Sequence, residues 1–567
     1  MGAPKPEFST TNVQVEGVDE ADIVKTDGKY IYTLAGVSGV WFHRNEDSKL
    51  IIAKAYPPDE SEILSETPLE IRPREMFIHG DYLLVFGSSR YIPAESSPEK
   101  MIVPYMELTT VQVWDVRDRT NPKLLRSIDF EGSYVSSRKI GPYVYFVINS
   151  YPDYRVLEKG SPEEEIIPSF RDRKGGDAKK ETAFSKICRC RDVEYFEPIN
   201  PERFVIIASV SLENPEGEIT KEVIVGSGQN IYASLHDLYI AETNYPFWFG
   251  GERSEEKTII HKFSLDEGKI SYSGHMEAPG HVLNQFSMDE HDSHFRVATT
   301  KGHASRSGGS ASNNVYVFDE NLEMVGKLED IAPGESIYSA RFMGERAYLV
   351  TFKKVDPFFV IDLSDPKNPK ILGKLKIPGY SDYLHPYDEN HIIGIGKETV
   401  EAEEELGDFV WYQGVKLAIF DATDVKNPKE LHRVVIGDRG TDSYALHDHK
   451  AFLFDREKNL LVIPILLAEI KGDKESLPRN TYGDYVFQGA YVYDISLDNG
   501  FVLKGRITHY ETNESFVKSG YYFRGEYDVK RSLYIDDVLY TISDKKIKLN
   551  SLADLSEIKE LVLGGKN

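Results

Sequence analysis

Short apolar runs separated by turn formers recur throughout this chain, and the stretch from Ser336 to Gly379 shows the pattern most clearly. Apolar residues alternate there with small or polar ones, as in strands with one buried face. Four strands are expected, at Ile337 to Phe342, Ala347 to Phe352, Phe358 to Asp362 and Ile371 to Ile377. Gly344-Glu345 provides a tight turn between the first two strands, and Asp-Pro-Lys-Asn-Pro-Lys is a loop between the last two. We name the four strands a, b, c and d.

Nearly the same a-b-c-d unit can be followed along the whole chain, and we count nine copies. One four-stranded sheet cannot bury both faces, so the copies must pack against one another. Radial packing makes an all-β fold, the β-propeller; a linear solenoid is disfavoured because no capping repeat is evident. Eight blades are the alternative if one hairpin is an appendage. The alternating segment Thr11 to Glu16 is expected to be an N-terminal strand that pairs with the last blade and helps ring closure.

Length and composition agree with a large β-rich repeat array. The 567 residues exceed the usual size of one hydrophobic core, and 40% of them are apolar, with abundant Tyr and Phe. We predict an extended N-terminal segment at residues 1–10 and a single propeller domain at residues 11–567, with a large third-blade insertion at residues 150–203. High Glu and Lys with few Cys and Met is compatible with a thermophilic source.

The charge pattern limits the classes of partner. The formal net charge is −25 and no run of Lys and Arg reverses it locally, so a nucleic acid partner is not expected. No apolar stretch of about 18 residues is present, so no transmembrane segment is expected. No signal peptide is visible; Met1-Gly-Ala-Pro-Lys-Pro is typical of a start residue placed on a mature N-terminus from which a signal peptide has been removed.

Several predicted c strands end in Asp and continue into similar loops. The strand ends Trp114-Asp115 and Val360-Ile-Asp362 resemble the blade of WD repeats, and the loops that follow Asp115, Asp362 and Asp421 resemble surface propellers with an LVIVD pattern. More closely, the chain resembles an archaeal and bacterial family of secreted proteins with a C-terminal β-propeller domain distantly related to WD repeats. That likeness is carried by Thr10 to Gly28, Ser381 to Pro386 and Asp448 to Phe454, and it covers nearly the whole chain. It implies an extracellular or cell-surface protein, but the family has no established activity or catalytic residues to carry over.

The connections between strands b and c are long in most copies, whereas the a-b turns have about two residues. Long connections are expected at Ser88 to Thr110, Ser150 to Arg203, Glu242 to Lys257, Thr300 to Asn313, Lys397 to Val415 and Leu466 to Gln488. In a propeller they all emerge on one face, and long loops gathered there indicate binding. Aromatic clusters around Trp248 and Trp411 could form a platform for sugars or peptides, or could pin the loops to the body. We predict a monomeric binding module for a protein, peptide or glycan ligand.

The predicted innermost strands carry cationic or protonatable side chains near their ends. They are Lys25, Arg138, Arg341, His385, His447 and Arg531. In so acidic a protein a basic channel would attract anions, although each residue could instead pair with a carboxylate of a neighbouring blade. An alternative function is a hydrolase or lyase for an anionic polymer or peptide, with His385, His447, Arg341 and Arg138 around the site. No local catalytic motif supports this reading, but propellers can gather catalytic residues from several blades.

A few residues are weak candidates for metal binding or redox chemistry. His447 and His449 could form a metal pair beside Asp448, but no third ligand can be placed. Asp19-Glu-Ala-Asp22 and Asp289-Glu-His-Asp292 could hold a structural calcium ion, yet neither matches the twelve-residue calcium loop, and ordinary turns explain them as well. Cys188 and Cys190 are too few for a zinc site, which leaves a vicinal-type bridge, a redox pair or two ordinary thiols.

Overall fold

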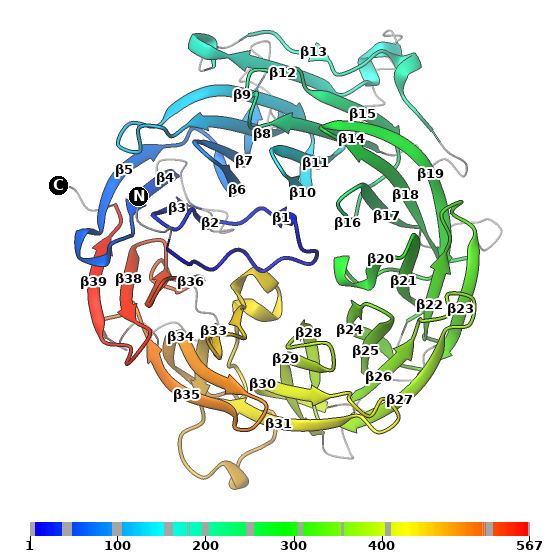
Figure 1. The fold of residues 1–567 in the computed structure, drawn as a ribbon, viewed down its shortest axis with the longest axis vertical. Coiled ribbons are helices and arrows are strands. Elements are labelled where there is room, and N and C mark those ends of the chain that lie inside the picture. Colours follow the sequence, from blue (N-terminus) through cyan, green and yellow to red (C-terminus); the bar gives the residue numbers. More distant parts are fainter. Residues whose placement is uncertain are drawn as a thin grey trace, which may run out of the picture. The chain divides into compact units, whose positions relative to one another are not determined.

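The strands of the protein assemble into nine antiparallel sheets built on one four-stranded plan, so the fold is a nine-bladed β-propeller, as the repeat predicted. The computed structural model describes residues 6–36, 48–92, 105–151, 163–178, 180, 182–195, 203–244, 255–303, 310–352, 356–402, 410–512, 514, 516 and 525–564. In each blade the strands follow the order a-b-c-d, as Figure 1 shows for β24 to β27.

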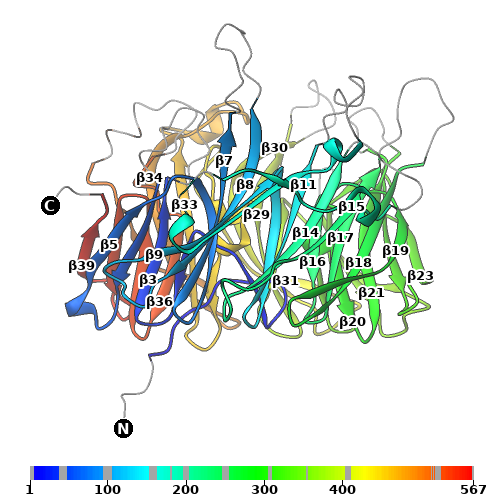
Figure 2. The same cartoon turned by 90° about the horizontal axis from the view of Figure 1, so that it is seen from above.

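Blades 1 to 3 come from the N-terminal part of the chain. Blade 1 contains β2 (Val24–Thr26), β3 (Tyr30–Ala35), β4 (Lys49–Lys54) and β5 (Glu62–Pro68). Blade 2 contains β6 (Arg72–His79), β7 (Tyr82–Tyr91), β8 (Met106–Asp115) and β9 (Lys123–Glu131). Blade 3 contains β10 (Ser133–Ile140), β11 (Tyr143–Ser150), β14 (Phe204–Ser211) and β15 (Thr220–Val225). Figure 2 shows β7 and β8 side by side, as their antiparallel pairing requires.

Blades 4 to 6 repeat the plan. Blade 4 contains β16 (Asn230–Ala233), β17 (Asp237–Asn244), β18 (Lys257–Asp266) and β19 (Lys269–Pro279). Blade 5 contains β20 (Met288–His291), β21 (His294–Lys301), β22 (Ser312–Phe318) and β23 (Met324–Ile331). Blade 6 contains β24 (Ser336–Met343), β25 (Arg346–Phe352), β26 (Asp356–Asp362) and β27 (Lys370–Ile377).

Blades 7 to 9 complete the set. Blade 7 contains β28 (Tyr380–Pro386), β29 (His391–Glu401), β30 (Val410–Asp421) and β31 (Lys429–Ile436). Blade 8 contains β32 (Leu453–Asp455), β33 (Leu460–Glu469), β34 (Asp484–Ser496) and β35 (Gly500–Ile507). Blade 9 contains β36 (Arg531–Ile535), β37 (Val538–Ile542), β38 (Lys546–Ser551) and β39 (Glu557–Val562).

Short 3-10 helices lie in the connections. They are η2 (Pro58–Glu60), η3 (Glu163–Ile166), η4 (Gly175–Asp177), η5 (Cys190–Asp192), η6 (Gln285–Ser287), η8 (Tyr444–Leu446), η9 (His449–Ala451) and η10 (Lys474–Ser476). Within the described ranges, none of the helices has the length and hydropathy needed to cross a membrane.

The chain divides into two compact units. Unit 1 comprises residues 1–242, 261–273 and 561–567, and unit 2 comprises residues 243–260 and 274–560. Blades 1 to 3 belong to unit 1, and blades 5 to 8 belong to unit 2. The single domain expected from the sequence stays a prediction.

The N-terminal strand differs from the prediction. Residues 11–16 are not a strand; the extra strand is β1 (Val18–Glu20), and it pairs with β10 of blade 3 rather than with the last blade. Alternation of apolar and polar residues in Thr11 to Glu16 suggested a strand, but such alternation does not specify which strand it would pair with. Gly17, which has a φ of +81°, separates that sequence from β1.

The third-blade insertion crosses to blade 2. Its strand β12 (Ser169–Lys174) pairs with β9, the d strand of blade 2, and β13 (Ser185–Lys186) pairs with β12. The blade 2 sheet therefore has six strands, and its edge is covered by the chain itself. Asp129 of β9 holds the insertion, because its buried carboxylate accepts hydrogen bonds from Arg171 Nε and Arg173 Nη2, both at 2.8 Å.

A bulge recurs in the a strands of blades 2, 3, 6 and 7. The extra residues, given by the breaks in register, are Arg74, Val135, Tyr338 and Asp382. Because a bulge shifts the strand by one residue, it sets which side chains beyond it share a face. Three residues after the bulge stand Phe77, Arg138, Arg341 and His385.

The loops after the c strands owe their shape to repeated aspartates. Asp115, Asp362 and Asp421 accept hydrogen bonds from the backbone N–H two residues later at 3.0, 3.0 and 2.8 Å. The aspartates three residues further on, Asp118, Asp365 and Asp424, do the same at 3.0, 3.1 and 3.1 Å. These are consecutive Asx turns, so the repeated Asp motif builds the loop. Aromatic side chains fill the space between blades; the rings of Phe358 and Phe420, for example, stack at 4.6 Å.

Candidate functional site

The b-c ends of the blades carry the long connections, as expected. Blade 2 is joined there by residues 92–105, blade 3 by residues 151–203 and blade 8 by residues 470–483. The a-b turns have two to four residues, and Gly80-Asp81 and Gly344-Glu345 are examples of two. Since antiparallel strands alternate in direction, the b-c connections of all blades leave the ends opposite to those turns. The predicted aromatic cluster around Trp248 lies outside the described residues.

Exposed tyrosines concentrate at the b-c ends. Among the described residues six tyrosines have strongly exposed side chains, and four belong to b-c connections: Tyr105, Tyr151, Tyr195 and Tyr482. A fifth, Tyr412, is the third residue of β30, where the b-c connection of blade 7 ends. The sixth, Tyr527, lies in the connection between blades 8 and 9, and Lys546 Nζ at the start of β38 is 5.6 Å from its ring, so it also lies at the b-c end of its blade. Large amphipathic rings left in solvent are characteristic of recognition surfaces.

Three of these tyrosines have an arginine over the ring. The guanidinium carbon of Arg90 is 4.7 Å from the centroid of the Tyr105 ring, and that of Arg203 is 4.9 Å from the Tyr151 ring. The corresponding distance from Arg439 to Tyr482 is 4.4 Å. Such stacking fixes an otherwise mobile ring and keeps its position defined.

The best-defined cluster lies in unit 2, between blades 7 and 8. Arg439 also stacks on Trp411, at 4.9 Å, so its guanidinium contacts two aromatic rings. It donates from Nη1 to the carbonyl oxygen of Tyr412 at 2.9 Å and from Nη2 to the hydroxyl of Tyr482 at 3.2 Å. Tyr482 remains 50% exposed and Tyr412 42% exposed. We call Trp411, Tyr412, Arg439 and Tyr482 the Arg439 cluster.

Hydrogen bonds hold the blade 8 connection in place beside this cluster. Asp438 accepts from the backbone N–H of Ile470 at 2.8 Å and from Lys474 Nζ at 2.7 Å. Gly483 N–H donates to the carbonyl oxygen of Arg439 at 2.8 Å. Gln413 Nε2 reaches the carbonyl oxygen of Arg479 at 3.0 Å. The loop is therefore preorganised, which lowers the entropic cost of binding.

Aromatic packing continues from the cluster into blade 6. The Tyr412 ring meets the Tyr380 ring edge to face at 5.2 Å, and Tyr380 in turn packs on Phe352 at 4.9 Å and on Tyr338 at 4.8 Å. Phe352 and Tyr380 are buried and Tyr412 is not. The row of rings therefore does both things expected of the aromatic loop. Its buried rings pin the loop to the body, and Tyr412 at its end is exposed for binding.

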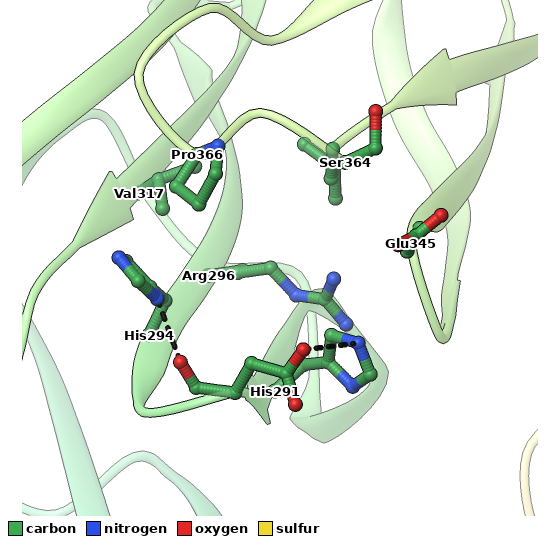
Figure 3. Close-up of a pocket in the computed structure, with 9 residues that line it drawn as sticks. His291, His294, Arg296, Val317, Glu345, Ser364 and Pro366 are labelled. Carbon is green, nitrogen blue, oxygen red and sulfur yellow. Dashed lines mark hydrogen bonds and ion pairs between the residues drawn. The ribbon is translucent and has the colours of Figure 1, made fainter.

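At the opposite, a-b end of blades 5 and 6 lies a small cavity of about 40 Å³, lined by His291, His294, Glu345 and Ser364 among others. Figure 3 shows Arg296 lying between His291 and the loop that carries Ser364 and Pro366. The guanidinium is engaged, because Arg296 Nε donates to Asp289 at 2.9 Å and Nη1 donates to the carbonyl oxygen of Gly344 at 2.6 Å. A cavity of this volume has room for ordered water but not for a sugar or a peptide.

Of the six inner-strand residues predicted to bind a ligand, three are engaged by carboxylates. In unit 1, Lys25 Nζ lies 2.8 Å from Asp19 Oδ1, and Arg138 Nη2 lies 4.0 Å from Glu20 Oε2. In unit 2, Arg531 forms an ion pair with Asp448. Burial raises the pKa of Asp448, but the neighbouring cations outweigh it, Arg531 most of all, and lower this pKa to about 2.

Arg341 and His385 come together in unit 2. The Arg341 guanidinium lies 5.2 Å from the Phe286 ring, and His385 Nδ1 is 3.0 Å from the Tyr383 hydroxyl. Burial among aromatic rings, with contributions from Arg341 and His449, lowers the pKa of His385 to about 3. His385 is therefore neutral at physiological pH and adds no positive charge. Its role in ligand binding stays a prediction.

The prediction that Ser443 to Asp455 forms one inner strand was wrong. The helices η8 and η9 precede the short strand β32, so His447 is an exposed residue at the end of η8 and is not on an inner strand. Ser443 and Asp448 cap these helices by accepting the N–H groups of Ala445 and Lys450. His449 instead packs its ring against Phe286, with centroids 4.9 Å apart.

No group of three or more His, Cys, Asp or Glu side chains suited to a metal ion occurs in the part of the chain that the structure describes. Asp289, from one of the candidate calcium turns, forms an ion pair with Arg296.

Cys188 and Cys190 are free thiols, not a bridge. Both pack against the apolar core of blades 2 and 3, and burial raises the pKa of Cys188 to about 11, which disfavours the reactive thiolate.

Comparison with known proteins agrees with this architecture. A family model described as beta propeller domain matches residues 8–555. The chain belongs to this family. Curated relatives include an uncharacterized protein of Archaeoglobus fulgidus, 28% identical over 97% of this chain and 84% of the relative. An uncharacterized protein of Methanocaldococcus jannaschii is 30% identical over 81% of this chain and 74% of the relative. The propeller thus has archaeal relatives; the WD relationship and the C-terminal placement implied by resemblance stay predictions.

Solved structures similar to this propeller are distant. They include a periplasmic gluconolactonase of Pseudomonas aeruginosa, with 9% identity and a TM-score of 0.32 over 64% of this chain and 92% of that one. An acylaminoacyl peptidase of Pyrococcus horikoshii has 11% identity and a TM-score of 0.34 over 84% and 57%. Apo AztD of Citrobacter koseri has 10% identity and a TM-score of 0.35 over 85% and 96%.

The sequence pointed to Trp411 and Tyr412 but not to Arg439 and Tyr482. Arg439 lies in the connection between blades 7 and 8, and Tyr482 is 43 residues away from it in a different b-c connection. A single aromatic residue in a polar loop has no periodic signal. The available signal was the length of the blade 8 connection, which already marked it as a candidate.

Proposed function

We propose that this propeller is a binding module whose partner is a protein, held by the exposed tyrosines at the b-c ends of the blades. The observation that carries the proposal is the distribution of those residues: all six strongly exposed tyrosines among the described residues lie at b-c ends. Tyr, Trp and Arg supply most of the binding energy at protein interfaces. An extracellular or cell-surface location is part of the proposal and rests on the sequence resemblance.

The Arg439 cluster in unit 2 is the best-defined part of the proposed interface. Its exposed rings stand on an ordered connection and on a buried aromatic row, so they lose little conformational freedom on binding. A hydrolase or lyase for an anionic polymer is less well supported. Lys25, Arg138 and Arg531 are engaged by carboxylates, and burial keeps His385 neutral.

A displayed library of random peptides, panned on the full-length protein, tests the proposal. Wild type is compared with the Tyr412→Ser, Tyr482→Ser double variant, and Met324→Ser is the control because Met324 is 40% exposed at the start of β23, at the opposite end of its blade. We expect enriched peptides that bind wild type and the control but lose at least tenfold in affinity for the double variant. Peptides that bind all three proteins equally would contradict the proposal. Binding to a glycan array without any enriched peptide would replace the protein partner with a carbohydrate.

A further inference from the structure

The outer strands of blades 6, 7 and 8 have a composition unlike the rest of the chain. Figure 1 shows β27, β31 and β35 following one another along the outer edge of unit 2. Every exposed residue of these three strands is either basic or aliphatic. The basic residues are Lys370, Lys374, Lys376, Lys429, Arg433, Lys504 and Arg506, and the aliphatic residues are Ile371, Leu431, Val435, Val502 and Leu503. We call these twelve side chains the outer basic face.

The three strands are in contact through neighbouring loops. His432 of β31 places Nε2 2.7 Å from the carbonyl oxygen of Leu497, and an added Cβ at Gly500, the first residue of β35, would lie 2.6 Å from the His432 ring. A Cβ at Gly373 of β27 would lie 2.2 Å from the carbonyl oxygen of Val425, in the loop before β31. The outer basic face is therefore continuous across three blades.

Carboxylates offset part of the positive charge. Lys370, Lys429 and Lys504 lie 3.3, 3.7 and 3.6 Å from aspartates of the c strands in their own blades. Arg433 lies 3.5 Å from Glu398. Lys374 and Lys376 are exposed and have no carboxylate within 4.0 Å among the described residues. A face without an exposed acidic side chain is unusual in a chain whose formal net charge is −25.

The aliphatic side chains share the surface with these cations. Val502 and Leu503 are adjacent and 49% and 46% exposed, and Ile371 is 40% exposed beside Lys370. Other outer strands lack this combination. β23 exposes Glu329 and Asp330 together with Met324 and Lys327, and β19 exposes Glu277.

We propose that the outer basic face binds the surface of an anionic lipid bilayer. Lys and Arg near such a surface are attracted to the headgroups, while exposed Val, Leu and Ile can enter the boundary between headgroups and acyl chains. A polyanion without an apolar layer, such as a nucleic acid, would leave the aliphatic residues without a partner. The combination of the two residue classes favours lipid. Binding here leaves the b-c ends available, so it is independent of the tyrosine interface.

The test is co-sedimentation of the full-length protein with vesicles. Vesicles of phosphatidylcholine with about one third phosphatidylglycerol are compared with pure phosphatidylcholine at low and high salt. One variant carries Lys374→Glu and Lys376→Glu, a second carries Val502→Ser and Leu503→Ser, and the matched control carries Met324→Ser and Lys327→Glu on β23. Circular dichroism and melting curves identify any variant that fails to fold.

We expect wild type and the control to sediment only with the anionic vesicles, and less at high salt. The lysine variant should bind at least tenfold more weakly, and the aliphatic variant should lose affinity at constant charge. Failure of wild type to bind anionic vesicles at low salt would overturn the proposal. So would equal binding by all variants, or tight binding of duplex DNA that is insensitive to Val502 and Leu503.

Discussion

The guanidinium of Arg439 stacks 4.4 Å from the ring of Tyr482 and also donates a hydrogen bond to the hydroxyl of that residue. One arginine thereby fixes both the plane and the rotation of an exposed ring. It links the connection between blades 7 and 8 to the b-c connection of blade 8. The proposed interface depends on this link, because a mobile ring would pay an entropic cost on binding.

Removal of the Arg439 side chain should loosen the blade 8 connection. Arg439→Ala deletes two ring contacts and two hydrogen bonds, together worth about 2 kcal/mol of local stability, or roughly 30-fold in the opening equilibrium. Hydrogen exchange of peptides covering residues 470–483 should accelerate accordingly. Lys471→Ala, which removes only an exposed ion pair with Asp484, is the control. Unchanged exchange in Arg439→Ala would show that the link does not hold the loop.

Asp129 should be required to hold the third-blade insertion on blade 2. Its buried carboxylate serves Arg171 and Arg173, so Asp129→Ala leaves charges uncompensated at a cost of about 3–5 kcal/mol. We expect trypsin to cut after Arg171 or Arg173 in the variant but not in wild type. Asp192→Ala, which removes an exposed pair with Arg189 and leaves every tryptic site in place, should leave the digestion pattern unchanged. A resistant Asp129→Ala variant would mean that strand pairing alone holds β12.

Asp382, the bulge residue of β28, should make stability depend on pH. Burial raises the pKa of its carboxyl to about 7, with Lys397 opposing and Asp442 adding to the shift. The folded protein therefore holds this proton more tightly than the unfolded chain, and stability falls as pH rises from about 4 to about 7. Asp382→Asn should melt at a higher temperature than wild type at pH 8 and close to wild type at pH 4. The same difference at both values would contradict a raised pKa.

Gly373 should tolerate no side chain, because an added Cβ would lie 2.2 Å from the carbonyl oxygen of Val425. Gly373→Ala should lower stability by about 1–3 kcal/mol, as overpacking does. Gly176→Ala is the control, since nothing lies within 4 Å of its Cβ position. Melting curves of the two variants measure the difference. A melting temperature of Gly373→Ala equal to wild type would show that the blade 7 loop can move away.

The repeat made the blade count predictable, because the period of two in Ser336 to Gly379 recurs locally in every blade. The pairing of strands from different blades was not predictable. β12 pairs with β9, but the sequence of β12 does not specify which strand it pairs with. The helices η8 and η9 were missed because apolar residues mask short capping signals at Ser443 and Asp448.

For the candidate sites too, local features were predictable from the sequence and long-range ones were not. The long b-c connections indicated the binding face from the sequence, and Tyr412 was among the residues indicated. The outer basic face could not be predicted from the sequence, because its cations come from three strands separated by dozens of residues and no single run is basic. Only packing of the blades brings β27, β31 and β35 together.

The most direct test of the account is the affinity of the best selected peptide, measured by titration calorimetry on wild type and on the Tyr412→Ser, Tyr482→Ser variant. Loss of the two tyrosines of the Arg439 cluster should weaken binding at least tenfold, which corresponds to about 1.4 kcal/mol, while Met324→Ser should bind as wild type does. Equal affinity for all three proteins, with equal melting temperatures, would place the binding surface away from the Arg439 cluster and contradict the account.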